Sequence, residues 1–208
     1  MSEERRKKLA AIKLAQELEP AVARVSNAVG KLARATGIHL GSDCYVHAEL
    51  SRALLSDLGF ETRRMVGFAG WRVGTGPDDV IGHTPRIEGH VPPGAENGLP
   101  YHAWLECAGL IIDCTTYLLR HKMQLLDAVD GGHSEVVWCP DFLILSRKEI
   151  RTHNELVLSR RPGLAYYEAH PELDPIPNSR FTVDPLDLQL ARMILRNPDM
   201  KVVGLEDT

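Results

Sequence analysis

Polar or aromatic residues alternate with small and aliphatic ones along residues 101–115, and the alternation is interrupted at Ala108-Gly109. Period-two alternation on both sides of a glycine predicts a β-hairpin. With a two-residue loop at Ala108-Gly109, His102 and Asp113 become diagonal neighbours, roughly 5–8 Å apart at the backbone. A four-residue loop keeps this register, whereas a three-residue loop places the two residues on opposite faces. In the first register one face of the hairpin holds His102, Trp104, Glu106, Ile111, Asp113 and Thr115.

The first sixty residues show a helical period instead. Residues 3–19 and 20–37 each carry one apolar stripe, and Pro20 is well tolerated as the first residue of a helix, so we expect a helical hairpin. Residues 41–59 predict a third helix, in which Ser42 or Asp43 is the N-cap and Gly59 follows the last turn.

Helices come first, strands follow, and further helices and strands follow these, and this order predicts an α+β fold. We expect strands within 60–73, 135–138 and 142–145, helices over 117–129 and 149–160 and from Asp184 onward, and irregular segments over 74–100 and 161–183. The longer irregular segment, 74–100, is expected to be a wall or lid of a site, or disordered. The predicted organisation is a helical hairpin (1–37), a core (38–148) and a C-terminal extension (149–208) packed on that core in one globular unit.

Composition narrows the function classes. The chain has 208 residues, 44% of them hydrophobic, and a net charge of -4, which argues against a general nucleic-acid partner because such proteins usually carry a basic face. No apolar stretch is long enough for a membrane span, and the N-terminus lacks the apolar segment of a secretory signal. We therefore expect a cytoplasmic protein. Cys44, Cys107, Cys114 and Cys139 show no CxxC spacing and are expected to be free thiols.

Candidate chemistry begins at Cys44, which falls in the first turn of the helix predicted over 41–59. Unpaired N–H groups and the helix dipole favour a thiolate at that place, although an incidental cysteine in a helix is the alternative. A thiol nucleophile also needs a base, and the base needs a third group that fixes its tautomer. Cys44, His102 and Asp113 are therefore a candidate catalytic triad. Cys107 and Cys114 point away from the His102 face in the predicted register.

Five short motifs occur in order: Gly41-x-x-Cys44-x-x-x-Ala48, Leu54-Leu55-x-x-Leu58-Gly59-Phe60-x-x-Arg63, Val66-Gly67-Phe68, His102-Ala103-Trp104-x-Glu106 and Asp113-x-Thr115. Together they resemble the core of the transglutaminase-like superfamily over about residues 41–116. The resemblance implies that Cys44, His102 and Asp113 form the catalytic triad. It also implies a papain-like fold, in which the cysteine helix packs on an antiparallel sheet.

Four further residues are candidates for substrate binding or support of the site: Trp104, Glu106, Asp43 and Tyr45. Trp104 is expected to pack against the helix of Cys44. Glu106 is expected to make a structural polar contact or to tune the site, and Asp43 and Tyr45 flank the nucleophile.

Cys44 and His47 lie one helical turn apart and could both bind a metal ion, but two ligands do not complete a metal site. We therefore expect no metal site, and we expect no cofactor. Backbone N–H of Cys44 is the expected oxyanion donor.

These residues predict a cysteine-dependent hydrolase that cleaves a peptide or amide bond through a thioester, with a peptide, protein or small amide as substrate. Three alternatives stay open: an acyl transferase or cross-linking transglutaminase, a partner-dependent leader peptidase like those of lasso-peptide maturation, which the short hairpin resembles, and a non-catalytic binding module.

Overall fold

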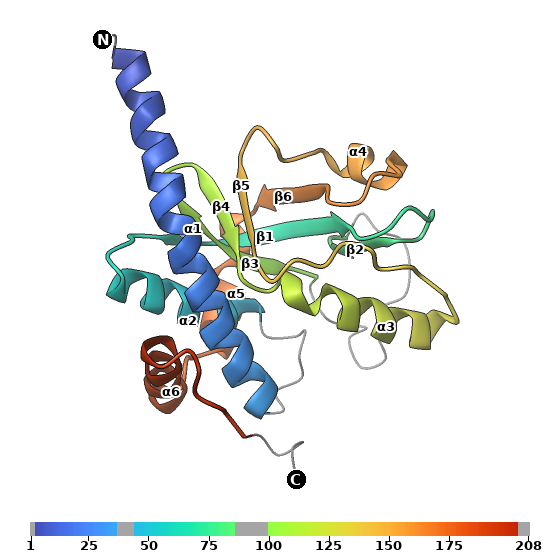
Figure 1. Ribbon diagram of the computed structural model, residues 1–208. Coiled ribbons are helices and arrows are strands. Elements are labelled where there is room, and N and C mark those ends of the chain that lie inside the picture. Colours follow the sequence, from blue (N-terminus) through green and yellow to red (C-terminus); the bar gives the residue numbers. More distant parts are fainter. Residues whose placement is uncertain (1–2, 37–43, 86–99, 204–208) are drawn as a thin grey trace.

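The computed structural model describes residues 3–36, 44–85 and 100–203, and these form an α+β protein (Figure 1). The strands are β1 (Arg63–Arg72), β2 (Val80–His83), β3 (His102–Cys107), β4 (Leu110–Asp113), β5 (Leu143–Ser146) and β6 (Ala165–Ala169). The helices are α1 (Glu3–Thr36), α2 (Cys44–Asp57), α3 (Leu119–Asp130), α4 (His153–Leu158), α5 (Pro175–Arg180) and α6 (Pro185–Arg196). The predicted α+β class, with helices at both ends of the described chain, is confirmed.

The strands form one curled antiparallel sheet around β1. Ala69 of β1 pairs with His83 of β2 and with Tyr167 of β6, and Gly67 pairs with His102 of β3 and again with β6. Because a strand has two edges, β2 and β3 must lie end to end along one edge of β1, with β6 along the other. β4 extends the sheet from β3, and β5 extends it from β4.

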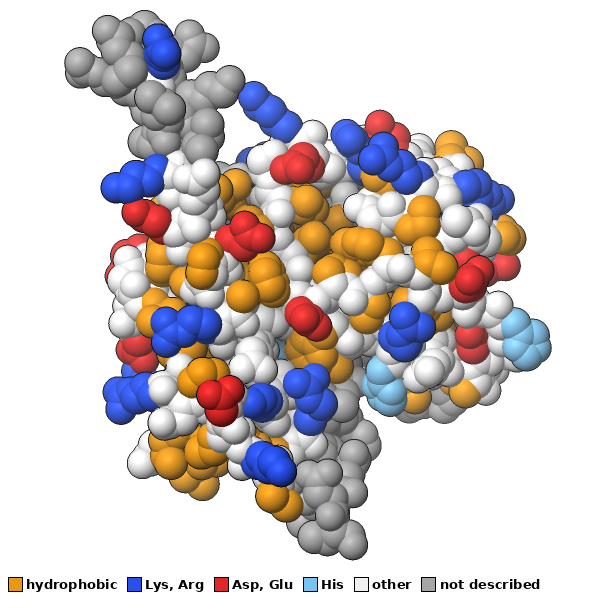
Figure 2. Space-filling view, in the orientation of Figure 1, with side chains coloured by type: hydrophobic (Ala, Val, Ile, Leu, Met, Phe, Trp, Pro, Cys, Tyr) orange, Lys and Arg blue, Asp and Glu red, His pale blue; other side chains and the backbone are white. Residues whose placement is uncertain are grey.

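The two faces of the sheet are buried in two separate hydrophobic clusters. Ala103 and Leu105 of β3 belong to the cluster that includes α1, α2 and α6. Trp104 lies between them in sequence and therefore points to the other face, where it joins Trp71 and, from α3, Met123. Over the described part of the face seen in Figure 2, basic and acidic side chains are interspersed around apolar ones.

A single helix, α1, replaces the helical hairpin expected over 1–37, so that prediction is wrong. Pro20 lies inside α1, where a proline removes one backbone hydrogen bond. Leu18, Val22 and Val25 are nevertheless fully buried, so one apolar stripe runs past the proline. Packing of that stripe against α2 and α6 holds the helix together, since tertiary contacts decide helix stability more than local propensity does.

Two segments expected to be irregular contain strands. β2 lies within 74–100, and β6 lies within 161–183 together with α5. β6 pairs with the central strand, so the segment after residue 148 contributes a strand to the sheet. Conversely, residues 135–138 are not a strand, although N–H groups of Val137 and Trp138 both donate to Val73 O. The rest of the expected loop, residues 86–99, lies outside the described residues.

Several local predictions are confirmed. α2 spans Cys44–Asp57 and Gly59 follows it with a φ of 87°, whereas its expected N-cap, Ser42 or Asp43, lies outside the described residues. α3 ends at Asp130 and is followed by Gly131 in the left-handed conformation, and α6 is capped by the Asp184 carboxylate, which accepts from Leu186 N at 2.7 Å. Within the described ranges, no helix is long and apolar enough to cross a membrane.

Candidate active site

The hairpin β3–β4 adopts the register predicted from its sequence. Ala108 and Gly109 form the loop with φ values of 48° and 84°, which is the backbone of a type I′ turn. Cys107 pairs with Leu110 and the ladder continues from there toward the strand ends. His102 Nε2 consequently lies 2.9 Å from Asp113 Oδ2, with both side chains fully buried.

Asp113 collects hydrogen bonds on both carboxylate oxygens. Oδ1 accepts from Thr115 N at 2.9 Å and from Thr115 Oγ1 at 2.7 Å. Oδ2 accepts from His102 and, at 2.7 Å, from the Tyr167 hydroxyl, which itself accepts from Trp71 Nε1 at 2.9 Å. Burial alone would raise the pKa of Asp113, but His102 and the Thr115 donors hold it well below its usual range. The carboxylate is therefore ionised and fixed in orientation.

Cys44 is near enough to His102 to act on its pKa by hydrogen bonding and charge. The imidazole makes its hydrogen bond to Asp113 through Nε2, and among the described residues the buried Nδ1 has no hydrogen-bond partner. Burial lowers the pKa of His102, yet Asp113 and then Cys44, by charge and hydrogen bonding, raise it to about 9. His102 and Asp113 are sealed from solvent, whereas Cys44 keeps 6% of its surface exposed. All three residues are therefore buried.

A second histidine, His83, lies beside His102, and sequence reasoning did not assign it to the site. His83 and His102 pair with Ala69 and Gly67, which are two residues apart on one face of β1. The rings therefore stack, with centroids 5.6 Å apart and planes 20° apart. Trp71 meets both rings edge-on, at 4.9 Å from His102 and 5.9 Å from His83.

Lys122 of α3 completes this side of the site and was also missed. Its Nζ lies 3.1 Å from His83 Nε2 and 5.8 Å from the centre of the Trp71 ring. Burial and the charge of Lys122 lower the pKa of His83 well below its usual value, so His83 is neutral and accepts from the ammonium. Burial also lowers the pKa of Lys122, and Cys44 and Asp113 oppose that effect. The feature of the sequence that could have indicated a role for Lys122 is its position on the apolar face of a predicted helix.

The expected support residues lie at three different places. Trp104 is on the His102 face as predicted, but the expectation that it packs against the cysteine helix is wrong, because α2 covers the opposite face. Glu106 makes ion pairs with Arg63 at 3.3 Å and Arg147 at 2.7 Å, which is the structural polar contact foreseen for it. Tyr45 donates to Asn178 Oδ1 at 2.7 Å and so contacts α5. Asp43 lies outside the described residues.

The other thiols and histidines near the motifs make no metal site within the described ranges. His47 Nε2 lies 3.0 Å from the Tyr117 hydroxyl. Cys107 lies five residues after His102 on β3 and so points to the opposite face, and Cys114 lines the small cavity against α2, so both point away from His102 as predicted. Burial raises the pKa of Cys114 to about 12, which makes it a poor nucleophile. All four cysteines are free thiols, as expected.

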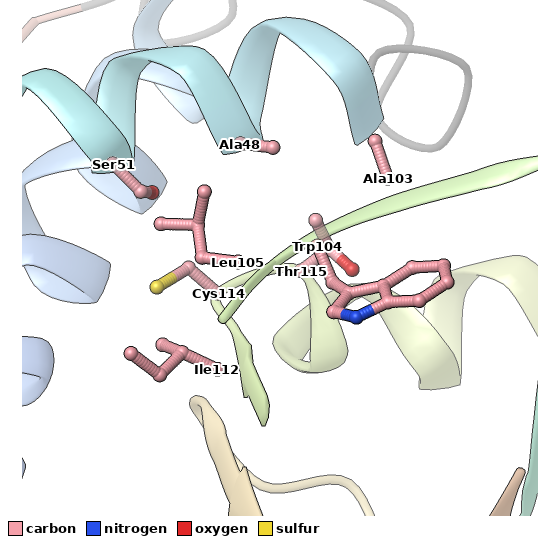
Figure 3. Close-up of a pocket in the computed structure, with 8 residues that line it drawn as sticks. All are labelled: Ala48, Ser51, Ala103, Trp104, Leu105, Ile112, Cys114 and Thr115. Carbon is pink, nitrogen blue, oxygen red and sulfur yellow. The ribbon is translucent and has the colours of Figure 1, made fainter. Parts of the chain in front are cut away.

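A small cavity beneath the hairpin belongs to the packing between α2 and β3 (Figure 3). It holds about 10 Å³ and lies between Ala48 and Ser51 of α2 and Ala103, Leu105 and Cys114 of the hairpin region. In Figure 3 the indole of Trp104 points away from α2. A cavity of this size holds at most one water molecule, so it is not a substrate site.

The arrangement therefore supplies a thiol at a helix start, a buried base and a fixed carboxylate in sequence order. It can transfer a proton between sulfur and imidazole and stabilise the resulting ion pair.

No family model matches the sequence, and no curated protein matches it. The chain is similar to a solved crystal structure described as genomics APC5867. The two share 14% identity, the alignment covers 85% of this chain and 78% of that one, and the TM-score is 0.56. At that identity the likeness concerns the fold alone.

Proposed function

We propose that the protein is a cysteine-dependent hydrolase of a peptide or amide bond, with Cys44, His102 and Asp113 as its catalytic triad. We also infer that its core is papain-like, in the manner of the transglutaminase-like superfamily, with α2 as the cysteine helix. The observation that carries the proposal is the buried pair of His102 Nε2 and Asp113 Oδ2, 2.9 Å apart, with Cys44 near enough to act on the same imidazole by hydrogen bonding and charge.

Two motif residues gain a physical role under this proposal. Thr115 donates twice to Asp113, so the Asp-x-Thr spacing serves to fix the carboxylate. Arg63 pairs with Glu106 across β1 and β3, which ties two of the resembling motifs into one structural contact.

The proposed reaction starts from the Cys44 thiolate and the His102 imidazolium. Sulfur attacks the carbonyl carbon, a C–S bond forms, and one electron pair of the carbonyl moves to oxygen. When the oxyanion collapses, the C–N bond breaks and His102 gives its proton to the leaving amine. Water then attacks the thioester, His102 takes a proton from it, and the acid leaves as the C–S bond breaks. Asp113 holds the Nε2–H of His102 through every step and keeps Nδ1 directed toward sulfur.

Iodoacetamide labelling of Cys44, followed by mass spectrometry of its peptide from about pH 5 to pH 10, tests the nucleophile. We expect Cys44 to label faster near pH 6 than Cys139, which is the partly exposed cysteine, and we expect His102→Ala to abolish that difference. Labelling of Cys44 no faster than a free thiol, with no effect of His102→Ala, would remove the enzyme hypothesis.

Acyl transfer and hydrolysis share the thioester and differ in what releases it. Incubation with a p-nitrophenyl ester should give a burst of p-nitrophenol and an acylated Cys44. Decay of that acyl-enzyme in water alone, unchanged by an added primary amine, supports hydrolysis. Decay that occurs only with the amine would instead assign the protein to the transferases.

A further inference from the structure

The imidazole of His102 is the middle member of a row of three rings on one face of the sheet. The row consists of His83, His102 and Trp104. Their backbone partners are alternate residues of β1, namely Ala69, Gly67 and Met65. The centre of the His102 ring lies 5.6 Å from that of His83 and 6.3 Å from that of Trp104, with interplanar angles of 20° and 13°. The proposed base is therefore held between two nearly parallel rings.

His83 is the member of this row that is anchored by a charge. Lys122 Nζ of α3 lies 3.1 Å from His83 Nε2, and only 8% of the Lys122 surface is exposed. Because an ammonium has three N–H donors and no acceptor, His83 Nε2 accepts, and the proton of the neutral ring lies on Nδ1. Trp71 meets the His83 ring edge-on at 5.9 Å and the His102 ring edge-on at 4.9 Å. His83 is thereby fixed in position, in tautomer and in charge.

Contact between His102 and Asp113 depends on the plane of the imidazole. Nε2 lies 2.9 Å from Asp113 Oδ2, and rotation of the ring about its Cβ–Cγ bond takes the N–H out of hydrogen-bond geometry. The χ2 torsion of a histidine has broad minima and does not fix this plane by itself. A rotated ring would no longer be parallel to its neighbours and would collide with the face of His83. Packing in the row therefore supplies the orientation that the torsion does not.

The charge of His83 matters as well as its shape. A second imidazolium centred 5.6 Å from the His102 ring would weaken proton binding to His102 by roughly a hundredfold, at an effective dielectric constant near 20. Among the described residues, the titratable groups that act on His83 are Lys122 of α3, His102 of β3 and Asp113 of β4. Burial, Lys122 and His102 hold the pKa of His83 well below its usual value, and Asp113 opposes them. His83 consequently stays neutral beside a charged His102.

We propose that the pair of Lys122 and His83 positions the base: the neutral His83 ring packs on His102, keeps Nε2 directed at Asp113, and leaves the proton of the two stacked imidazoles on His102. The inference rests on the function proposed above, in which His102 takes a proton and returns it. A base that turns away from Asp113 loses the carboxylate that raises its proton affinity. His83 and Lys122 act through His102 and are positioning residues.

Three variants separate the ring, its nitrogen and its anchor. His83→Ala removes the ring from the row, and His83→Phe keeps a flat ring without a nitrogen. Lys122→Met keeps the His83 ring and removes its anchor. His121→Ala, at an exposed histidine of the same helix as Lys122, is the matched control. NMR spectroscopy reads out the titration of the His102 ring protons against pH and the nitrogen shifts of the His83 ring, which report its tautomer.

In the wild type we expect His102 to titrate near pH 9, and His83 to be neutral at pH 6 with its proton on Nδ1. The midpoint of His102 in His83→Ala should fall toward 6.5, with a loss of proton affinity of roughly tenfold or more, because the contact with Asp113 is no longer held. His83→Phe and His121→Ala should titrate near the wild type. In Lys122→Met the His83 ring should lose its single tautomer.

A folded His83→Ala in which His102 titrates as in the wild type would overturn the positioning role, even if its melting temperature is lower, because only a structural role then remains. If His83→Ala does not fold, the wild type decides: a proton on His83 Nε2, or a charged His83 at pH 6, would overturn the proposal. Fast iodoacetamide labelling of wild-type Cys44 keeps the proposed function intact in these cases. Slow labelling of wild-type Cys44 removes that function, and with it the role of His102 as a base.

Discussion

Asp113→Asn is the substitution that most directly tests how the site works, because four donors converge on this carboxylate. Thr115 N, Thr115 Oγ1, the Tyr167 hydroxyl and His102 Nε2 all lie within 2.9 Å of its oxygens. An asparagine has one accepting oxygen and one donating amide. Because Thr115 N is a backbone donor that cannot turn away, the oxygen should stay on that side, and the amide then faces His102.

An amide facing Nε2 forces the neutral His102 into the tautomer with its proton on Nδ1, toward Cys44, where the ring can no longer accept the thiol proton. The charge is lost as well. The pKa of His102 is raised from 6.5 to about 9, and the Asp113 carboxylate is the first cause that raises it. That rise corresponds to about 3 kcal/mol. We therefore expect the iodoacetamide rate at Cys44 near pH 6 to fall by roughly a hundredfold or more in Asp113→Asn.

The assay is peptide-level mass spectrometry of Cys44 after timed labelling, with Cys139 as an internal standard in the same sample. Asp174→Asn is the matched control, because this carboxylate binds Arg64 at 2.8 Å and has no contact with the triad. Thermal melting confirms that each variant is folded. A folded Asp113→Asn that labels Cys44 at the wild-type rate near pH 6 would refute the argument from charge and tautomer.

The remaining predictions concern the surroundings of the triad. Tyr167→Phe removes a hydrogen bond to an ionised carboxylate and leaves Trp71 Nε1 without its acceptor. The free energy of urea unfolding should fall by about 2–3 kcal/mol, against about 1 kcal/mol for Tyr45→Phe, whose partner is a neutral amide. Equal losses for the two variants would contradict the role of Tyr167 in holding the Asp113 carboxylate. The pKa of His102 is raised from 6.5 to about 9, so its contribution to stability is complete below pH 6.5 and is lost as the pH rises through about 9. The free energy of urea unfolding of the wild type should fall by about 3 kcal/mol over that window. His102→Phe should lack this loss. Gly67→Ala places a Cβ against the backbone of β6 and should lower stability by about 1–3 kcal/mol, which a melting curve that matches the wild type would disprove.

The β3–β4 hairpin shows how much local sequence determines. Its register follows from the alternation of side chains and from a turn in which Ala108 and Gly109 both take positive φ. That register alone sets His102 beside Asp113. The αL residue Gly59 after α2 is equally local, because the end of a helix depends on a few neighbouring residues.

The N-terminal helix shows where a local rule fails. Pro20 is a reasonable first residue of a helix, and the sequence predicts a break there. The observed α1 continues because the buried stripe on both sides of the proline packs against α2 and α6, and α6 lies more than a hundred positions away in the sequence. The backbone hydrogen bond lost at Pro20 is outweighed by the burial of apolar side chains against distant helices. A short stretch of sequence around the proline does not reveal that contact.

The sequence by itself determined the hairpin and the helix that carries Cys44, and it indicated the three residues of the candidate triad. Only the tertiary structure decided what surrounds them. β2 and β3 share one edge of β1, so His83 stacks on His102 although the two are nineteen positions apart in the chain. β6 on the other edge brings the Tyr167 hydroxyl to Asp113, and α3 brings Lys122 to His83. Turn chemistry and periodicity act between neighbours in sequence, whereas these contacts follow from burial and strand pairing between distant segments, whose partners are chosen only when the whole core is assembled.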